Sequence, residues 1–219
     1  MKGGLFCFSM KVFQVVAWAF GAVVFLLLAL IAAFWLFGPT VTFQSFTPVD
    51  VTILPIEELS VPDGFTITEY ARVENARSIA IGPEGVLFIG SRGAGKVHAV
   101  FDDNNDMVAD RVVLIDEGLF SPNGVQYRDG DLYVMEIDTL SVYPDILNNL
   151  ESPQKEVLFD GYPSDRHHGW KFIRFGPDGL LYIPVGAPCN VCDEPLPYST
   201  ITRLDVDNLE AGMQLLRMA

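Results

Sequence analysis

Negative charge is missing from the start of the sequence. No Asp or Glu precedes Asp50, and no charged residue of either sign separates Lys11 from Asp50. Within this gap, residues 12–37 are apolar apart from Gln14. A bilayer core of ~30 Å needs ~20 such residues as a helix, because only a helix satisfies every backbone polar group internally. We therefore expect one N-terminal transmembrane helix, over residues 12–38.

A cleaved signal peptide is the alternative interpretation of this run, but its apolar region spans only ~7–15 residues. Here the run is longer and ends in the bulky residues Phe34–Phe37, which suit a membrane interface. Lys2 and Lys11 are the only charges before it, and positive charge favours the cytoplasmic side. The sequence thus predicts a cytoplasmic N-terminus over residues 1–11 and a domain on the outer, periplasmic side of the cytoplasmic membrane.

Basic side chains are scarce in the whole sequence. It has 14 Lys and Arg against 28 Asp and Glu, which gives a formal net charge of −14. Such an acidic excess excludes an electrostatic surface for nucleic acid, and anionic lipid headgroups would repel it. Small neutral molecules or cations are the better partners for the exported domain.

Cysteine is also scarce, with three residues in the chain. Cys189 and Cys192 form a Cys-Asn-Val-Cys motif that would face an oxidising compartment, so a local disulfide is expected. A redox motif needs a thioredoxin-like βαβ context, whereas these cysteines follow an expected strand into a Pro-rich loop. Free thiols, or a metal or redox site, are the alternatives.

What the sequence does contain is a repeated hairpin of strand, tight turn and strand. The turn glycines Gly85, Gly130 and Gly179 lie 45 and 49 residues apart. A period of ~40–50 residues with short strands is typical of the blades of a β-propeller, whereas a β-sandwich would not explain the interval. The three hairpins are Ser78–Ile89, Gly124–Val134 and Lys171–Ile183. The two expected outer strands are Lys96–Val100 and Val112–Ile115.

These repeats predict an all-β domain over residues 63–207, after a tether over residues 39–62. Its first strand is expected at Phe65–Tyr70, where apolar and polar residues alternate. Three blades are visible, with room for about one more, whereas closure usually takes ~4–8 blades. Residues 208–219 have lost the strand pattern. We therefore expect an atypical tail and a C-terminally truncated propeller.

The densest polar cluster is Pro163–Lys171, just before the third hairpin. In a propeller, the loop that feeds an innermost strand borders the central channel. A histidine there suits general-base catalysis, because its pKa of ~6.5 lets it exchange a proton near neutrality. The alternative is that His167 and His168 are solvated in a loop.

Several motifs resemble the glucose/sorbosone dehydrogenase family over roughly residues 61–207. They are Ser91–Val97, Ser121–Val125, Ser164–Phe172 and Gly186–Cys192. The resemblance implies a six-bladed propeller that binds pyrroloquinoline quinone (PQQ), with calcium, on its axis. It also implies oxidation of a sugar or aldehyde.

The resemblance assigns roles to individual residues of the cluster. In the family, the histidine base lies eight residues before a Gly-Pro-Asp turn, and His168 stands at that distance from Gly176. His167 occupies the neighbouring position and is a further cofactor contact. The cofactor's quinone and carboxylates need cations and amide donors, for which the candidates are Arg92, Asn123 and Lys171.

An acidic loop presents hard oxygen atoms at alternating positions, which suits calcium. Its four potential ligands are Asp102, Asn104, Asp106 and Asp110. Met107 replaces the glycine that a sharp calcium loop requires, so a solvated acidic turn is the alternative.

Two functions of different classes follow from these observations. The first is a membrane-anchored quinoprotein dehydrogenase that oxidises a sugar or sorbosone-like substrate, with an electron acceptor that the sequence does not identify. The second is a non-catalytic propeller that binds a ligand or a partner. A propeller lactonase would need a carboxylate-ringed metal on the axis, and the polar cluster offers only Asp165.

Overall fold

The computed structural model describes residues 18, 21, 23, 24, 27 and 56–216. It divides into two compact units, Met1–Leu54 and Pro55–Ala219, which we describe separately. In the first unit the described residues are helical. No helix within the described residues is long and apolar enough to cross a membrane. The N-terminus predicted over residues 1–11, and most of the predicted anchor and tether, lie outside the described residues.

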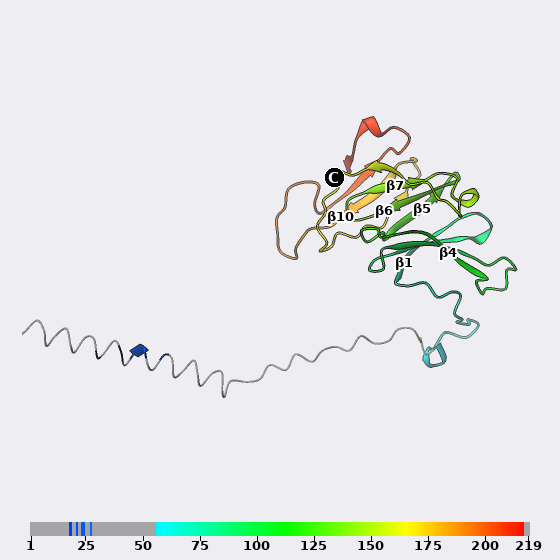
Figure 1. Cartoon of the computed structure of the whole chain (residues 1–219), viewed down its shortest axis with the longest axis horizontal. Coiled ribbons are helices and arrows are strands. Elements are labelled where there is room, and N and C mark those ends of the chain that lie inside the picture. The colour runs from blue at the N-terminus through cyan, green and yellow to red at the C-terminus, as the bar shows by residue number, and fades with distance from the viewer. Residues whose placement is uncertain (1–17, 19–20, 22, 25–26, 28–55, 217–219) are drawn as a thin grey trace, which may run out of the picture. The chain divides into compact units, whose positions relative to one another are not determined.

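The second unit is all-β and consists of three antiparallel four-stranded sheets (Figure 1). Within each sheet, strands that are consecutive in the sequence are neighbours. Blade 1 is formed by β1 (Ala76–Ile81), β2 (Leu87–Ser91), β3 (Lys96–Phe101) and β4 (Arg111–Glu117). Blade 2 is formed by β5 (Gly124–Arg128), β6 (Asp131–Met135), β7 (Leu140–Tyr143) and β8 (Glu156–Phe159). Blade 3 is formed by β9 (Arg174–Phe175), β10 (Leu181–Val185), β11 (Thr200–Leu204) and β12 (Gln214–Leu216).

The repeated hairpins are confirmed as the first two strands of each blade. Gly85, Gly130 and Gly179 each have a positive φ in the tight turn, a conformation that glycine adopts without steric cost. Among the described residues, one short 3₁₀ helix, η1 (Ile56–Glu58), precedes β1. Three others lie in connections between strands: η2 (Pro83–Gly85), η3 (Ile146–Asn148) and η4 (Leu209–Ala211). Three blades of this kind make the unit a partial β-propeller.

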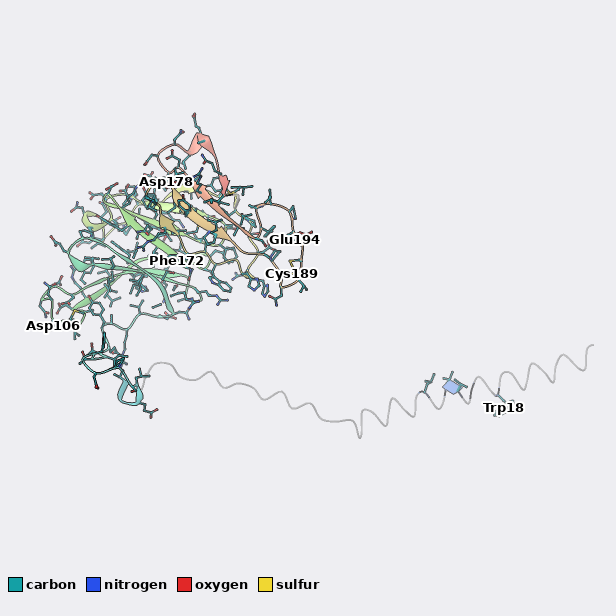
Figure 2. All side chains as sticks on the ribbon, turned by 180° about the vertical axis from the view of Figure 1, so that it is seen from behind. Trp18, Asp106, Phe172, Asp178, Cys189 and Glu194 are labelled. Carbon is teal, nitrogen blue, oxygen red and sulfur yellow. A yellow bond between two sulfur atoms is a disulfide. The ribbon has the colours of Figure 1, made fainter. Side chains whose placement is uncertain are left out.

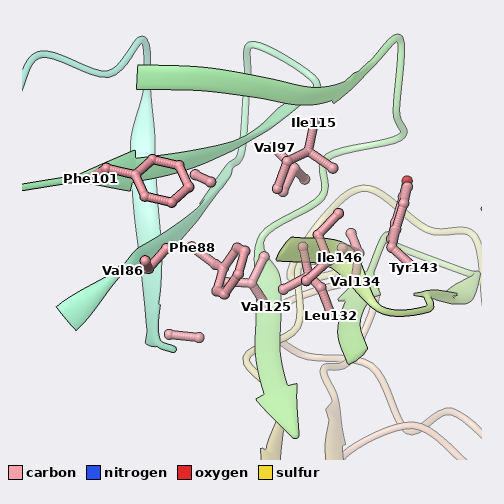
Figure 3. Close-up of a cluster of buried hydrophobic side chains, with 12 residues drawn as sticks. Val86, Phe88, Val97, Phe101, Ile115, Val125, Leu132, Val134, Tyr143 and Ile146 are labelled. Atoms are coloured by element: carbon pink, nitrogen blue, oxygen red, sulfur yellow. The ribbon is translucent and has the colours of Figure 1, made fainter. Parts of the chain in front are cut away.

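Blade 2 is packed on both of its faces, as β6 illustrates. Successive side chains of a strand point to opposite faces of the sheet. Leu132 and Val134 belong to the core cluster shared with blade 1 (Figure 3), whereas Tyr133 and Met135 belong to the cluster shared with blade 3. This near-continuous apolar run is therefore what a strand between two sheets requires.

Two expectations at the ends of the domain are wrong. Phe65–Tyr70 forms no strand, and Phe65 is 70% exposed, because no sheet edge in the described unit pairs with its backbone. Conversely, the expected tail contains β12, which pairs with β11 and completes blade 3. The strand pairing of blade 3 thus continues past residue 207, the limit expected for the domain. The third hairpin is also shorter than expected, since β9 begins only at Arg174.

Because the sheets are simple meanders, their connections alternate between two edges. We call "upper edge" the edge with the connections β2–β3, β4–β5, β6–β7, β8–β9 and β10–β11, and "lower edge" the edge with the other connections. Figure 2 shows Asp106 and Asp178, which belong to lower-edge connections, away from Cys189 and Glu194 of the upper edge.

Candidate active site

The five residues expected to bind the cofactor or to act in catalysis all belong to connections of the upper edge. Arg92 lies between β2 and β3, and Asn123 directly precedes β5. His167, His168 and Lys171 lie between β8 and β9. The meander topology therefore gathers at one edge residues that are up to 79 positions apart in the sequence.

The two histidines are held by backbone carbonyls of the β10–β11 connection. Nδ1 of His168 lies 3.0 Å from the Ala187 oxygen, and Nδ1 of His167 lies 3.1 Å from the Pro188 oxygen. A carbonyl oxygen can only accept a hydrogen bond, so Nδ1 of each ring donates. In the neutral ring Nε2 is then unprotonated and free to accept a proton, which is the state that a general base needs.

His168 is positioned by close backbone packing. Its φ of 54° lies in the left-handed region, which costs a non-glycine residue about 1–2 kcal/mol. Gly186 lies against it, because a Cβ added there would be 2.3 Å from the His168 oxygen. The Tyr198 hydroxyl donates a 2.5 Å hydrogen bond to Asp165, which also joins the two connections. The orientation of His168 is therefore set by the β10–β11 connection.

An arginine and a tryptophan form a platform beside the histidines. The Arg92 guanidinium carbon lies 3.6 Å from the centre of the Trp170 ring, and Arg92 is exposed. The rings of Trp170 and His168 meet edge to face, with 6.3 Å between their centres. A stacked guanidinium keeps its charge and its planar donors, so this platform suits a flat anionic molecule. Trp170 directly follows the His-His-Gly sequence, but no role was expected for it.

Lys171 was expected to contact the cofactor, but its side chain points into the protein. It is 1% exposed, and its ammonium donates hydrogen bonds to the backbone oxygens of Ile137 and Gly169. Burial lowers the pKa of Lys171 to about 8, although Asp138 and Asp165 partly oppose this shift. Lys171 therefore joins the β8–β9 and β6–β7 connections and presents no charge to a ligand.

Asn123 is also buried, at 3% exposure, and it borders a groove of about 350 Å³. Its Nδ2 donates to the Lys171 backbone oxygen at 2.9 Å, whereas its Oδ1 has no hydrogen-bond partner. A buried acceptor without a donor costs about 1–3 kcal/mol. The groove is lined by Arg77, Ser78, Asn123, Trp170, Phe172 and Pro184. Phe172 ends the motif Ser164–Phe172 but was assigned no role, and Arg77 belongs to no motif of the sequence.

The acidic loop lies at the lower edge, between β3 and β4, and not beside the histidines. Its side chains accept hydrogen bonds from the backbone of the same loop. Asp102 Oδ2 accepts from Met107, Asn104 Oδ1 from Asp106, and Asp110 Oδ2 from Asp103. The part of the chain that the structure describes holds no group of three or more His, Cys, Asp or Glu able to bind a metal ion.

Cys189 and Cys192 are joined by a disulfide in the β10–β11 connection. This connection also carries Ala187 and Pro188, whose carbonyls hold the two histidines. The disulfide therefore closes a small loop directly after the histidine contacts.

Comparison with known families identifies one match. The family described as "Domain of unknown function (DUF7133)" matches residues 56–206, which include all of blades 1 and 2 and most of blade 3. No curated protein matches the chain significantly.

Solved structures share the fold of the second unit at low identity. The PQQ domain of pyranose dehydrogenase from Coprinopsis cinerea has a TM-score of 0.51 and 16% identity, over 61% of this chain and 34% of that chain. The PQQ-bound aldose sugar dehydrogenase from Streptomyces coelicolor has a TM-score of 0.45 and 18% identity, over 62% and 46%. Virginiamycin B lyase from Staphylococcus aureus has a TM-score of 0.42 and 13% identity, over 65% and 41%. The chain thus spans about a third to a half of the length of these structures.

Proposed function

The chain belongs to the DUF7133 family, and from the geometry of its upper edge we propose that it is a quinoprotein dehydrogenase of sugars or sorbosone-like aldehydes. The observation that carries this proposal is the His168 ring, whose Nδ1 is held by the Ala187 carbonyl at 3.0 Å. Its Nε2 is the base that takes the hydroxyl proton of the sugar, or of the hydrate formed when water adds to the aldehyde. General-base catalysis of this kind contributes about 10²–10⁴-fold to a rate.

The residues around His168 fit a flat, anionic cofactor such as PQQ. Arg92 offers planar donors to a carboxylate while its guanidinium stacks on the Trp170 ring. The unpaired Oδ1 of Asn123, at the neighbouring groove, would accept a hydrogen bond from an N–H or O–H group. When bound, PQQ supplies the oxidant that receives two electrons from the substrate. Lys171 plays no direct part in this binding, because its ammonium is occupied by two backbone carbonyls.

The residues that suggested calcium in the sequence do not belong to this site. The four oxygen-bearing residues that suggested it lie in the β3–β4 connection, at the edge opposite to His168. Their side chains are engaged with the backbone of their own loop. The proposal therefore includes PQQ and assigns no calcium to the residues of this loop.

We further propose that the domain lies outside the cytoplasmic membrane, held by residues 12–38. Two observations support this location. The sequence has an uncharged apolar run long enough to span a bilayer, and Cys189 and Cys192 are joined by a disulfide. Disulfides persist in oxidising compartments and are rare in the cytosol.

Dye reduction by the full chain in detergent, with added PQQ and a panel of aldoses, tests the dehydrogenase. His168→Gln should lower kcat about 10²–10⁴-fold while PQQ still quenches tryptophan fluorescence as in the wild type. His98→Gln is the matched control. His98 lies in β3 and takes part neither in the contact between Arg92 and Trp170 nor in the contact between His168 and Trp170.

Two results would count against the proposal in different ways. Unchanged activity in His168→Gln would remove His168 from catalysis. Absence of saturable quinone binding by a folded protein would favour the alternative, a non-catalytic propeller that binds a ligand or partner. The burial of Lys171, which leaves the site with fewer cations than expected, is the observation that favours this alternative.

A further inference from the structure

The groove beside Trp170 is formed by residues of all three blades. Blade 1 contributes two residues of β1, blade 2 the residue directly before β5, and blade 3 two residues before β9 and one of β10. In this order they are Arg77, Ser78, Asn123, Trp170, Phe172 and Pro184. The groove has a volume of about 350 Å³, near the lower limit of about 300–1,000 Å³ for ligand pockets. Its size therefore suits one small molecule.

Three of the six lining residues are apolar or aromatic. Phe172 is 49% exposed, although Lys171 before it and Ile173 after it are buried, at 1% and 0% exposure. Trp170 connects the groove to the proposed base, because the centre of its ring lies 6.3 Å from the centre of the His168 ring. Such apolar side chains can cover the C–H bonds of a sugar ring and hold it close to His168.

The polar lining residues offer partners to hydroxyl groups. Asn123 Nδ2 donates to the Lys171 backbone oxygen at 2.9 Å. Because a carbonyl oxygen can only accept, this bond fixes the orientation of the amide and leaves Oδ1 without a donor within the described residues. Ser78 is 6% exposed, and its hydroxyl group can donate or accept. A ligand with several hydroxyl groups therefore finds both kinds of partner.

Arg77 is the cation of the groove, and none of the other lining residues is charged. It is exposed, and among residues 56–216 it takes part in no ion pair. Four other arginines do pair with carboxylates of the same chain: Arg72, Arg111, Arg128 and Arg203. The planar guanidinium matches a carboxylate with two parallel hydrogen bonds. Arg77 is therefore available to an anionic ligand.

The local charge of the groove outweighs the net charge of the chain for a bound ligand. The net charge of −14 favours neutral or cationic partners for the domain as a whole. Exposed charges more than about 8–10 Å apart are largely screened at physiological salt, whereas Arg77 lines the groove itself. A carboxylate in the groove is therefore attracted by Arg77 and meets no acidic lining residue.

We propose that this groove selects sugars that carry a carboxylate as the substrates of the dehydrogenase. Arg77 binds the carboxylate, Asn123 accepts a hydrogen bond from a hydroxyl group, and Phe172 covers the C–H face of the sugar. Arg92, which stacks on Trp170, remains with the cofactor. The inference rests on the proposed function: it leaves the chemical step unchanged and adds the substrate class and the residue that selects it.

Binding measured without PQQ tests the groove independently of turnover. Isothermal titration calorimetry of the full chain in detergent compares D-glucuronate with D-glucuronamide, which has the same hydroxyl groups and nearly the same size but no charge. The wild type should bind glucuronate about 3–10-fold more tightly, because the carboxylate gains a charge-assisted pair at a partly exposed site. High salt should reduce this preference by screening the carboxylate from Arg77.

Variants of two arginines locate the preference. Arg77→Gln should abolish it, and Arg77→Lys should restore part of it, because the charge returns without the planar fork. Arg174→Gln is the matched control and should keep the preference. Arg174 is another exposed arginine without an ion pair among the described residues, and it does not line the groove. Circular dichroism verifies that each variant is folded.

Two binding results would overturn the proposal. The first is equal affinity of the wild type for glucuronate and glucuronamide, which would mean that the groove does not recognise a carboxylate. The second is a preference for glucuronate that survives in folded Arg77→Gln, which would place the carboxylate elsewhere on the chain.

Kinetics with PQQ separate this inference from the proposed function. In dye reduction, Arg77→Gln should raise the KM of glucuronate about 3–10-fold and leave kcat and the KM of glucose unchanged, as expected when uniform binding is lost. Turnover of glucose without binding or turnover of glucuronate would leave the dehydrogenase standing and remove this substrate class. Selective binding of glucuronate without turnover of any sugar would instead contradict the dehydrogenase, and with it the role of the ligand as substrate.

Discussion

At the scale of single residues, Lys171 carries a charge where the fold offers little water. The residue is 1% exposed, and burial lowers its pKa from 10.5 to about 8. Below about pH 8 the lysine is protonated in both the folded and the unfolded chain, and the full cost of burying the charge applies. Between about pH 8 and 10.5 only the unfolded chain keeps the proton, so stability should rise with pH.

We therefore expect the free energy of unfolding of the wild type to increase by about 2–3 kcal/mol between pH 7.5 and pH 10 relative to Lys171→Met. Urea denaturation followed by circular dichroism at several pH values measures both proteins. Comparison with the variant cancels the titration of tyrosines above pH 10. Parallel pH profiles of the two proteins would show that Lys171 does not titrate in this range.

The same residue shows how far a sequence can predict a site. The cluster Pro163–Lys171 was identifiable because polar residues gather before a hairpin. The direction of each side chain was not, since the partner of Lys171 at Ile137 lies 34 positions away. The spacing of residues within the cluster does not indicate a contact with a residue so far away in the sequence. For the same reason Arg77 and Phe172 were missed, because only the packing of the blades brings them to one groove.

At the scale of elements, the β8–β9 and β10–β11 connections act as one unit. A Cβ at position 186 would lie 2.3 Å from the His168 oxygen and 2.9 Å from its Cβ. Gly186→Ala should therefore displace His168 from the Ala187 carbonyl. A misplacement of about 1 Å can cost about 10²-fold in rate, so we expect kcat in the dye-reduction assay to fall about 10–100-fold.

Gly85→Ala provides the control for this prediction. Gly85 has a φ of 81° at the lower edge, with nothing within 4 Å of an added Cβ. Alanine there should lower stability by about 1 kcal/mol or more through backbone strain, with activity retained. Thermal unfolding and kcat, measured on both variants, separate the two effects. An equal loss of kcat in both would mean that general destabilisation, and not His168, explains the result.

The elements themselves were more predictable than the site. Turn glycines and alternating strands are local signals, so the hairpins of all three blades could be placed from sequence. The pairing of a strand is not local. Phe65–Tyr70 has the pattern but no partner in the described unit, whereas Gln214–Leu216 has little pattern but lies beside β11. Both errors thus arise where the formation of a strand depends on an available edge.

At the scale of the whole molecule, the meanders place the candidate site and the acidic β3–β4 loop at opposite edges of the sheets. The upper edge holds His168, Arg92 and the groove beside Trp170, together with the disulfide of the β10–β11 connection. The lower edge holds the acidic β3–β4 loop.

The disulfide also connects the fold to the compartment that we propose for it. If the domain lies outside the membrane, Cys189 and Cys192 stay oxidised in the cell, and Cys7 is the remaining cysteine of the chain. Alkylation of free thiols in intact cells and during lysis, followed by intact-mass measurement, should then add at most one label per chain. Reduction before alkylation is the control and should give three. Three labels without reduction would place the domain in a reducing compartment, because a cytosolic glutathione pool keeps such thiols reduced.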